Sequence, residues 1–217
     1  MLIMTLTKRT AEKTISESLT ILENRGIIAY STESSYALGA LATDEKAVKR
    51  LYELKKRPAE KPLPLIVGDM DTLESIAAEI PPRAKDLMKR FWPGPLTLIF
   101  EARENIPALL TGGTGKVAVR IPGKSAALDL AMALKLPVTA TSANPSGKPP
   151  AEDPYAVISY FGEKIDMIVD TGKAPGGRPS TIVDVTVTPP EILREGSVSL
   201  EFIENQQGYF IPINDSK

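Results

Sequence analysis

Short apolar runs alternate with amphipathic helical stripes along most of this 217-residue chain, and this alternation limits the folds that it can adopt. The spacing predicts helices at 11–25, 44–56, 71–80, 82–91, 127–134 and 153–161, and strands at 27–30, 63–67, 96–100, 117–121, 137–141, 167–169, 181–185 and 192–193. We therefore predict an α/β (α+β-like) domain with a large twisted mixed sheet and flanking helices. No linker divides the chain, so one domain is expected over 1–208, with a loose tail at 209–217.

Two helix starts are predicted from capping residues. Asp44 suits the N-cap of the helix that ends near Lys56, and Asp71 with Glu74 resembles a capping box. Gly26 is expected to end the first helix.

The chain contains no cysteine and no histidine. Disulfides, thiol nucleophiles, haem or Fe–S ligation by these residues, and a histidine base are therefore excluded, and a structural zinc site is not expected. The available chemistry belongs to Lys, Arg, hydroxyls, carboxylates, backbone amides and a hard metal ion.

Overall charge is nearly balanced, with 26 basic and 27 acidic residues and a net charge of −1. This balance does not predict a nucleic-acid partner, although it is compatible with a local basic patch. No apolar stretch approaches the length of a membrane span, and the apolar run within residues 1–10 is too short for a signal peptide. A cytoplasmic protein is expected.

Hydroxyl side chains gather at the ends of three predicted strands, in the segments 31–39, 139–147 and 176–184. Ligands of α/β sheets bind beyond the carboxyl ends of strands, so these segments are candidates for one binding site. Polar loops and Asx or Ser turns are the alternative interpretation of each segment alone.

Basic side chains recur beside these strand ends. The helical stripe turns Lys55 inward, and Arg57 follows at the helix end, a pair that suits a polyphosphate. The alternative is that they are ordinary basic residues near a helix C-terminus. Arg120 interrupts an apolar strand, and alternation directs it toward a cleft. These features together predict an anion or nucleotide site.

Gly112, Gly113 and Gly115 would let the backbone approach a ligand closely. The nearby segment Gly123-Lys124-Ser125 is not a P-loop, because Ala118 stands where the first glycine is required.

Seven ordered segments resemble the YrdC-type threonylcarbamoyl-AMP synthase family, and the resemblance covers about 19–196. The segments are Ser31-Thr32-Glu33 to Gly39, Lys55-Lys56-Arg57-Pro58, Trp92-Pro93-Gly94-Pro95-Leu96-Thr97, Val119-Arg120-Ile121-Pro122, Ser142-Ala143-Asn144-Pro145-Ser146-Gly147, Pro179-Ser180-Thr181-Ile182-Val183-Asp184 and Arg194-Glu195-Gly196. The chain resembles the short form of the family, without the extra C-terminal domain.

The resemblance implies a sheet twisted around a concave basic cavity. It implies L-threonine, bicarbonate and ATP as substrates, with Mg²⁺ on the phosphates and no assigned metal ligands. The products would be threonylcarbamoyl-AMP and pyrophosphate, and a tRNA-threonylcarbamoyl transferase complex would use the adenylate. The resemblance does not indicate whether the protein itself contacts tRNA.

The same resemblance implies roles for eight residues. Lys55, Arg57, Ser142 and Asn144 would be the catalytic tetrad that holds the ATP phosphates, and Arg194 would contact the nucleotide. Thr32, Arg120 and Ser180 would bind threonine, with Arg120 on its carboxylate.

Three positions depart from the family pattern. Ser31 replaces a proline, Ala37 replaces a glycine, and Gly68 stands where many members carry a histidine. Two other functions are compatible with the same fold. One is a non-catalytic module that binds double-stranded RNA, tRNA or the ribosome, which the low aromatic content of 6% disfavours. The other is a related carbamoyl-adenylating domain, which uses carbamoyl phosphate as its substrate.

Overall fold

Two mixed β-sheets and a set of flanking helices make up the computed structural model, which describes residues 1–199. The strands are β1 (Leu2–Thr5), β2 (Ile28–Ser31), β3 (Tyr36–Gly39), β4 (Leu65–Ile66), β5 (Leu96–Glu101), β6 (Lys116–Arg120), β7 (Val138–Thr139), β8 (Thr141–Ser142), β9 (Met167–Asp170), β10 (Thr181–Asp184) and β11 (Glu191–Arg194). The helices are α1 (Ala11–Glu23), α2 (Glu45–Lys55), α3 (Met70–Glu74), α4 (Pro82–Phe91), α5 (Ala126–Leu134), α6 (Pro154–Phe161) and the short 3₁₀ helix η1 (Gly162–Lys164).

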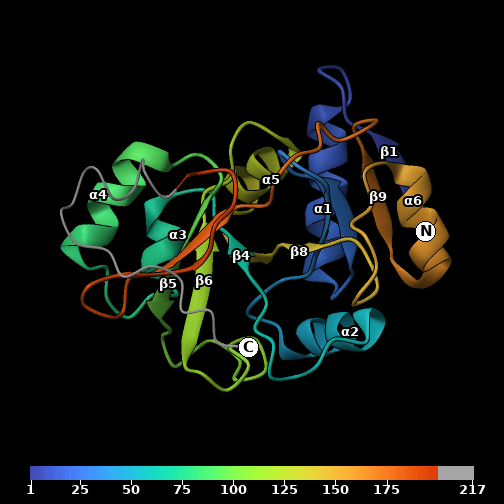
Figure 1. Cartoon of the computed structure of the whole chain (residues 1–217). Helices are drawn as coiled ribbons and strands as arrows, with labels where there is room; N and C mark the ends of the chain where they lie inside the picture. Colours follow the sequence, from blue (N-terminus) through green and yellow to red (C-terminus); the bar gives the residue numbers. More distant parts are fainter. Residues whose placement is uncertain (200–217) are drawn as a thin grey trace.

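The five-stranded sheet has the order β1-β9-β2-β3-β8, and the six-stranded sheet has the order β11-β10-β5-β6-β4-β7. Each contains both parallel and antiparallel pairs. Helices α3 and α4 lie beside the six-stranded sheet, whereas α1, α2 and α6 lie toward the five-stranded sheet (Figure 1). The α/β class is confirmed, and the strands are divided between two sheets rather than gathered in one.

Helix α2 illustrates how the local sequence builds the fold. The Asp44 side chain accepts hydrogen bonds from the backbone N–H groups of residues 46 and 47 at 2.9 and 3.0 Å, as the capping prediction required. The buried stripe continues to Lys55, and Lys56 then adopts a left-handed conformation that ends the helix. The predicted inward orientation of Lys55 is confirmed, since the residue is only 1% exposed.

The predicted strand over 137–141 is wrong as a single strand. Thr139 pairs with Leu65 in the six-stranded sheet, whereas Thr141 pairs with Leu38 in the five-stranded sheet. At Ala140, between them, the backbone N–H donates to the Pro64 carbonyl at 2.8 Å. Five consecutive residues therefore cross from one sheet to the other.

Two predictions about α3 need correction. Helix α3 begins after Asp69, whose carboxylate accepts from the N–H and hydroxyl of Thr72 at 2.8 and 2.6 Å, so Asp71 is not the N-cap. The helix ends at Glu74, because the following residues turn to meet the end of β5 through an Ala77–Ala102 bridge.

The polar segment after β2 is not a loop throughout. Its second half, Tyr36–Gly39, is the buried strand β3, which pairs antiparallel with β2. The N-terminal residues Leu2–Thr5 also form a strand, β1, which the sequence pattern did not predict. The predicted tail over 209–217 lies outside the described residues. None of the described helices combines the length and apolar character needed to span a bilayer.

Candidate active site

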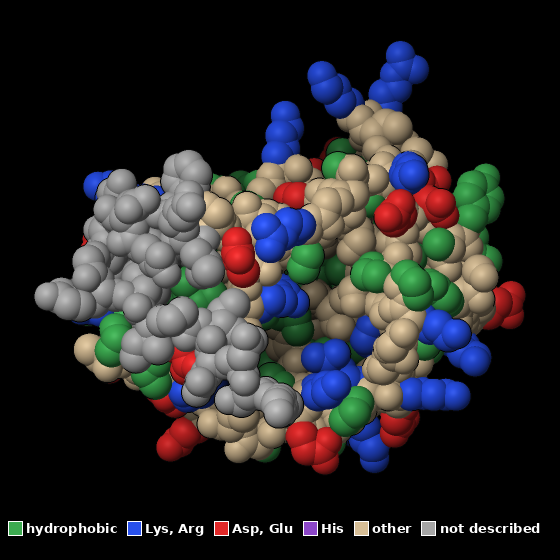
Figure 2. Space-filling view, in the orientation of Figure 1, with side chains coloured by type: hydrophobic (Ala, Val, Ile, Leu, Met, Phe, Trp, Pro, Cys, Tyr) green, Lys and Arg blue, Asp and Glu red, His purple; other side chains and the backbone are tan. Residues whose placement is uncertain are grey.

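A cavity of about 610 Å³ opens between the two sheets. The β2–β3 hairpin and β8 supply its wall on one side, and β5, β6, β10 and β11 supply the other. Figure 2 shows a hollow at the centre of this face with Lys and Arg side chains around it. The described lining holds four basic residues, Arg57, Lys61, Arg120 and Arg194, and a single acidic one, Glu60. The cavity is therefore suited to anionic ligands.

Six of the eight predicted site residues line this cavity. They are Thr32, Arg57, Arg120, Ser142, Ser180 and Arg194. The other two, Lys55 and Asn144, are buried and lie outside the described lining. The structure thus brings together side chains from distant segments of the sequence. Of the predicted phosphate-binding tetrad, however, only Arg57 and Ser142 line the cavity, whereas Lys55 and Asn144 are buried behind its wall.

Lys55 is held by the backbone of the segment that contains the other two tetrad residues. Its ammonium donates to the Ser142 carbonyl and, at 2.7 Å, to the Asn144 carbonyl. The carbonyl of Lys55 also accepts from the Ser146 N–H at 3.0 Å. Lys55 therefore fixes the shape of the 142–146 loop from the end of α2.

Asn144 contributes an unpaired oxygen to this loop. Its amide nitrogen donates to the carbonyls of Pro145 and Lys148. Its Oδ1 atom is buried and has no hydrogen-bond partner among the described residues. A buried acceptor without a donor carries a desolvation cost, so this atom is suited to a ligand or cation.

Burial of Lys55, and to a lesser extent the charge of Arg57, lowers the pKa of the Lys55 ammonium to about 7. In the unfolded chain, Lys55 should keep its ordinary pKa of 10.5. Between about pH 7 and 10.5 the unfolded chain therefore binds one proton more than the folded protein. We expect the free energy of unfolding to rise with pH between about 7 and 10.5, by up to about 1.4 kcal/mol per pH unit.

Urea denaturation at several pH values would measure this slope. The matched control is Lys55→Met, which lacks the titrating group and should lose that part of the slope. Identical pH dependence in the two proteins would contradict the lowered pKa.

Arg57 stands at the cavity wall and is anchored to the loop that follows α2. Its Nε atom donates to the Lys61 carbonyl at 3.0 Å, and one terminal nitrogen donates to the Pro62 carbonyl at 2.9 Å. The second terminal nitrogen has no protein partner within residues 1–199. A charged donor is thus available on an oriented guanidinium.

Thr32 lines the cavity within the tight turn of the β2–β3 hairpin. Its hydroxyl donates to the Ser35 carbonyl at 2.9 Å and accepts from the N–H groups of Ser34 and Ser35 at 3.2 and 3.3 Å. The hydroxyl therefore fixes the turn, and it leaves Ser34 and Ser35 beside it in the lining. Neither serine is among the site residues that the sequence predicts.

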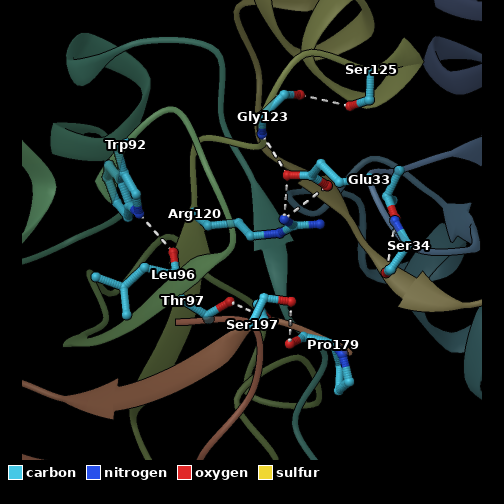
Figure 3. A network of polar contacts seen from close by, with 12 residues as sticks. Glu33, Ser34, Trp92, Leu96, Thr97, Arg120, Gly123, Ser125, Pro179 and Ser197 are labelled. Atoms are coloured by element: carbon cyan, nitrogen blue, oxygen red, sulfur yellow. Dashed lines mark hydrogen bonds and ion pairs between the residues drawn. The ribbon is translucent and has the colours of Figure 1, made fainter. Parts of the chain in front are cut away.

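Arg120 projects from the end of β6 into the same cavity, as strand alternation predicted. One terminal nitrogen, Nη1, lies 2.7 and 3.0 Å from the two carboxylate oxygens of Glu33 (Figure 3). Glu33 belongs to a quoted motif, but the motif alone gave no indication of this contact.

Ser180 and Arg194 form a neighbouring pair. Arg194 donates through Nε and one terminal nitrogen to the Ser180 carbonyl at 3.1 and 2.8 Å. The Ser180 hydroxyl lies 2.8 Å from that of Thr97, a buried residue of β5 that also lines the cavity. Partial burial, and then the positive charge of Arg120, lowers the pKa of Arg194. The two arginines therefore face the same region of the cavity.

The three departures from the family pattern have distinct environments. Ser31 accepts a hydrogen bond from the Thr171 hydroxyl at 2.7 Å, which ties the end of β2 to the segment after β9. Ala37 lines the cavity. Gly68 packs against the backbone of α5, where an added Cβ would lie 2.4 Å from the Ala131 carbonyl oxygen. Of the three, Ala37 alone lines the site directly.

Comparisons with known proteins agree with this geometry. A protein-family model named Sua5_yciO_yrdC and described as telomere recombination matches residues 20–196. A threonylcarbamoyl-AMP synthase of Pyrococcus abyssi is 42% identical over 95% of this chain and 61% of its own length. One from Bacillus subtilis is 38% identical over 90% of this chain and 57% of its own length.

The solved structure of P. abyssi Sua5 complexed with L-threonine matches 98% of this chain with a TM-score of 0.93 and 41% identity. The match covers 62% of that chain. This chain thus spans about three fifths of the length of these relatives.

Proposed function

Because this chain belongs to the Sua5–YciO–YrdC family, we propose that it is a threonylcarbamoyl-AMP synthase. The observation that supports this proposal most strongly is that six residues from separate motifs line one cavity. L-Threonine, bicarbonate and ATP are the substrates, and the products are threonylcarbamoyl-AMP and pyrophosphate. The relatives' names do not favour the alternative of a non-catalytic RNA-binding module.

The proposed chemistry needs no nucleophilic side chain. Threonine and bicarbonate form N-carboxythreonine with loss of water. An oxygen of its new carboxylate bonds to the α-phosphorus of ATP as the bond from that phosphorus to pyrophosphate breaks. The protein must hold both reactants in line and stabilise the charge that builds up on phosphorus, and a chain without cysteine or histidine can do both.

The residues at the cavity wall suit these tasks. Arg120 would bind the threonine carboxylate, because a guanidinium accommodates a carboxylate with two parallel hydrogen bonds. Thr32 and Ser180 would complete the threonine subsite, and a subsite that pairs the substrate hydroxyl rejects analogues that lack it. On the nucleotide side, Arg57 and Ser142 would contact the phosphates, and Arg194 would contact the nucleotide.

Lys55 and Asn144 enter the proposal differently. Lys55 would act through the loop that carries Ser142, because its ammonium already contacts two carbonyls of that loop. Asn144 offers its unpaired Oδ1 atom from within the same loop.

Mg²⁺ bound with ATP is part of this proposal. The described residues contain no group of three acidic side chains that could hold a metal, so phosphate oxygens and water would be its main ligands, as is usual for Mg²⁺. The Glu60 carboxylate in the lining and the unpaired Asn144 Oδ1 atom are oxygen donors that fit a hard cation. When bound, the ion would neutralise phosphate charge.

A tRNA-threonylcarbamoyl transferase complex would consume the adenylate, and the protein would act in the cytoplasm.

One reaction tests the function. Purified protein is mixed with ATP, Mg²⁺, L-threonine and bicarbonate, and pyrophosphate release and the mass of the adenylate are followed. We expect pyrophosphate release to require both threonine and bicarbonate. Release that is independent of threonine, or the absence of the adenylate, would contradict the proposal.

A further inference from the structure

Glu33 stands directly behind Arg120 without lining the cavity itself. It lies in the turn between β2 and β3, whereas Arg120 ends β6 in the other sheet. Its two carboxylate oxygens contact the same guanidinium nitrogen, at 2.7 and 3.0 Å (Figure 3). The ion pair therefore links the two walls of the cavity through a carboxylate that is not part of the described lining.

A second contact fixes the carboxylate in place. Its Oε1 atom also accepts a hydrogen bond from the backbone N–H of Gly123. Gly123 permits this approach because an added Cβ would lie only 3.1 Å from the same oxygen. The Gly123 carbonyl in turn accepts from the Ser125 hydroxyl at 2.8 Å. The position of Glu33 is thus determined by the turn after β6 as well as by Arg120.

This arrangement leaves one edge of the Arg120 guanidinium open. Glu33 engages only Nη1, and neither Nε nor Nη2 has a hydrogen-bond partner within residues 1–199. Arg120 itself lines the cavity, so the open edge is available to a ligand there. A guanidinium with one edge open accommodates a single carboxylate through two parallel hydrogen bonds.

Glu33 also changes the charge of this region. Arg57, Lys61 and Arg194 line the same cavity, and among the described residues no carboxylate forms an ion pair with any of them. Arg120 alone among the four cations is paired. The reactants of the proposed reaction are a polyphosphate and an amino acid, and a polyphosphate gains most from cations whose charge is not neutralised.

We propose, on the basis of the function proposed for this cavity, that Glu33 is a positioning and specificity residue. It holds Arg120 with a single edge open to the amino-acid carboxylate, and it keeps polyphosphate away from that guanidinium. The Glu33 carboxylate thereby directs the amino acid and the polyphosphate to separate parts of the same cavity.

Glu33→Gln tests the proposal, because it keeps the shape and an acceptor oxygen but removes the charge. We expect the KM for L-threonine to rise about tenfold, while kcat and the KM for ATP stay near the wild-type values. Glu33→Ala removes both contacts and should raise the threonine KM further. A general loss of folding would lower the active fraction without this split between the two substrates.

Inorganic tripolyphosphate supplies a second readout that a merely structural role would not change. In the wild type it should compete with ATP and not with threonine. In Glu33→Gln it should compete with both, because the guanidinium is no longer neutralised. The same competition can be followed by calorimetry, which requires binding and no turnover.

Lys116→Gln is the matched control. Lys116 lies at the opposite end of β6 from Arg120, and its ammonium forms an ion pair with the Asp184 carboxylate at 3.0 Å. Neither residue lines the cavity, so the substitution breaks an ion pair outside the site. It should leave the threonine KM and the tripolyphosphate pattern unchanged.

The outcomes separate this inference from the proposed function. Unchanged threonine binding and an unchanged inhibition pattern in Glu33→Gln, in a protein whose wild type forms the adenylate, would overturn the inference alone. Wild type that binds threonine and forms no adenylate would overturn the function alone, and the calorimetric competition would still decide the role of Glu33. Wild type that binds neither threonine nor tripolyphosphate would overturn both.

Discussion

Arg120→Ala is expected to lower kcat/KM for L-threonine by about a hundredfold or more, because it removes two charge-assisted hydrogen bonds to the substrate carboxylate. The loss should appear mainly in the threonine KM, since the phosphate-binding side of the cavity is unchanged. Stability should change little, because Glu33 retains its contact with Gly123 and remains partly exposed.

Arg120→Lys sharpens this test. Lysine keeps the positive charge but provides a point charge instead of a planar pair of donors. We expect an intermediate loss, of about tenfold, with Lys116→Gln on the same strand as the control. Steady-state kinetics with threonine and ATP varied in turn would measure both variants. Normal threonine dependence in Arg120→Ala would show that the carboxylate binds elsewhere.

Arg57→Ala is expected to reduce adenylate formation by about a hundredfold, because an oriented guanidinium at the wall no longer contacts the phosphates. The free energy of unfolding should stay within about 0.5 kcal/mol of the wild type, since the two backbone carbonyls that the side chain contacts lie in an exposed loop. Pyrophosphate release and urea denaturation check the two parts. Near-normal turnover would show that the phosphate assignment is wrong.

Lys55→Met separates support of the loop from direct contact. We expect adenylate formation to fall at least about tenfold, because two carbonyls of the 142–146 loop lose their donor. Unlike Arg57→Ala, this variant should also speed amide hydrogen exchange in that loop. Unchanged exchange, together with lost activity, would instead favour direct contact between Lys55 and the phosphates.

The direction in which a side chain points was predictable from periodicity. Helical spacing placed Lys55 inside, and strand alternation placed Arg120 toward a cleft, because both arguments use only local geometry. Periodicity distinguishes buried positions from exposed ones, but it does not distinguish a position in the packed interior from one at a cavity wall. Lys55 was therefore correctly placed inside, while its position behind the wall depends on a loop almost ninety residues away.

Residues whose role depends on a distant partner could not be found this way. Thr97 is one hydroxyl in an apolar strand, and its contact with Ser180 and its place in the cavity lining mark it as part of the site. Glu33 gains its role from Arg120, which lies in the other sheet. In both cases the decisive contact joins segments that are far apart in the sequence.

The division into two sheets was also beyond local reasoning. No glycine or proline interrupts residues 138–142. The crossing at Ala140 results from pairing with Leu65 in one sheet and with Leu38 in the other. Helix α3 shows the same limit on a smaller scale, because its early end is set by the bridge between Ala77 and Ala102.

The place of β9 in the five-stranded sheet has a consequence for biosynthesis. β1 and β2 do not pair with each other, because β9, residues 167–170, lies between them and pairs in parallel with both. While the chain emerges from the ribosome, the first two strands must wait for a segment made more than a hundred residues later. The buried faces of β2 and β3 stay without their full cover during that interval, which makes the nascent chain a candidate for chaperone binding.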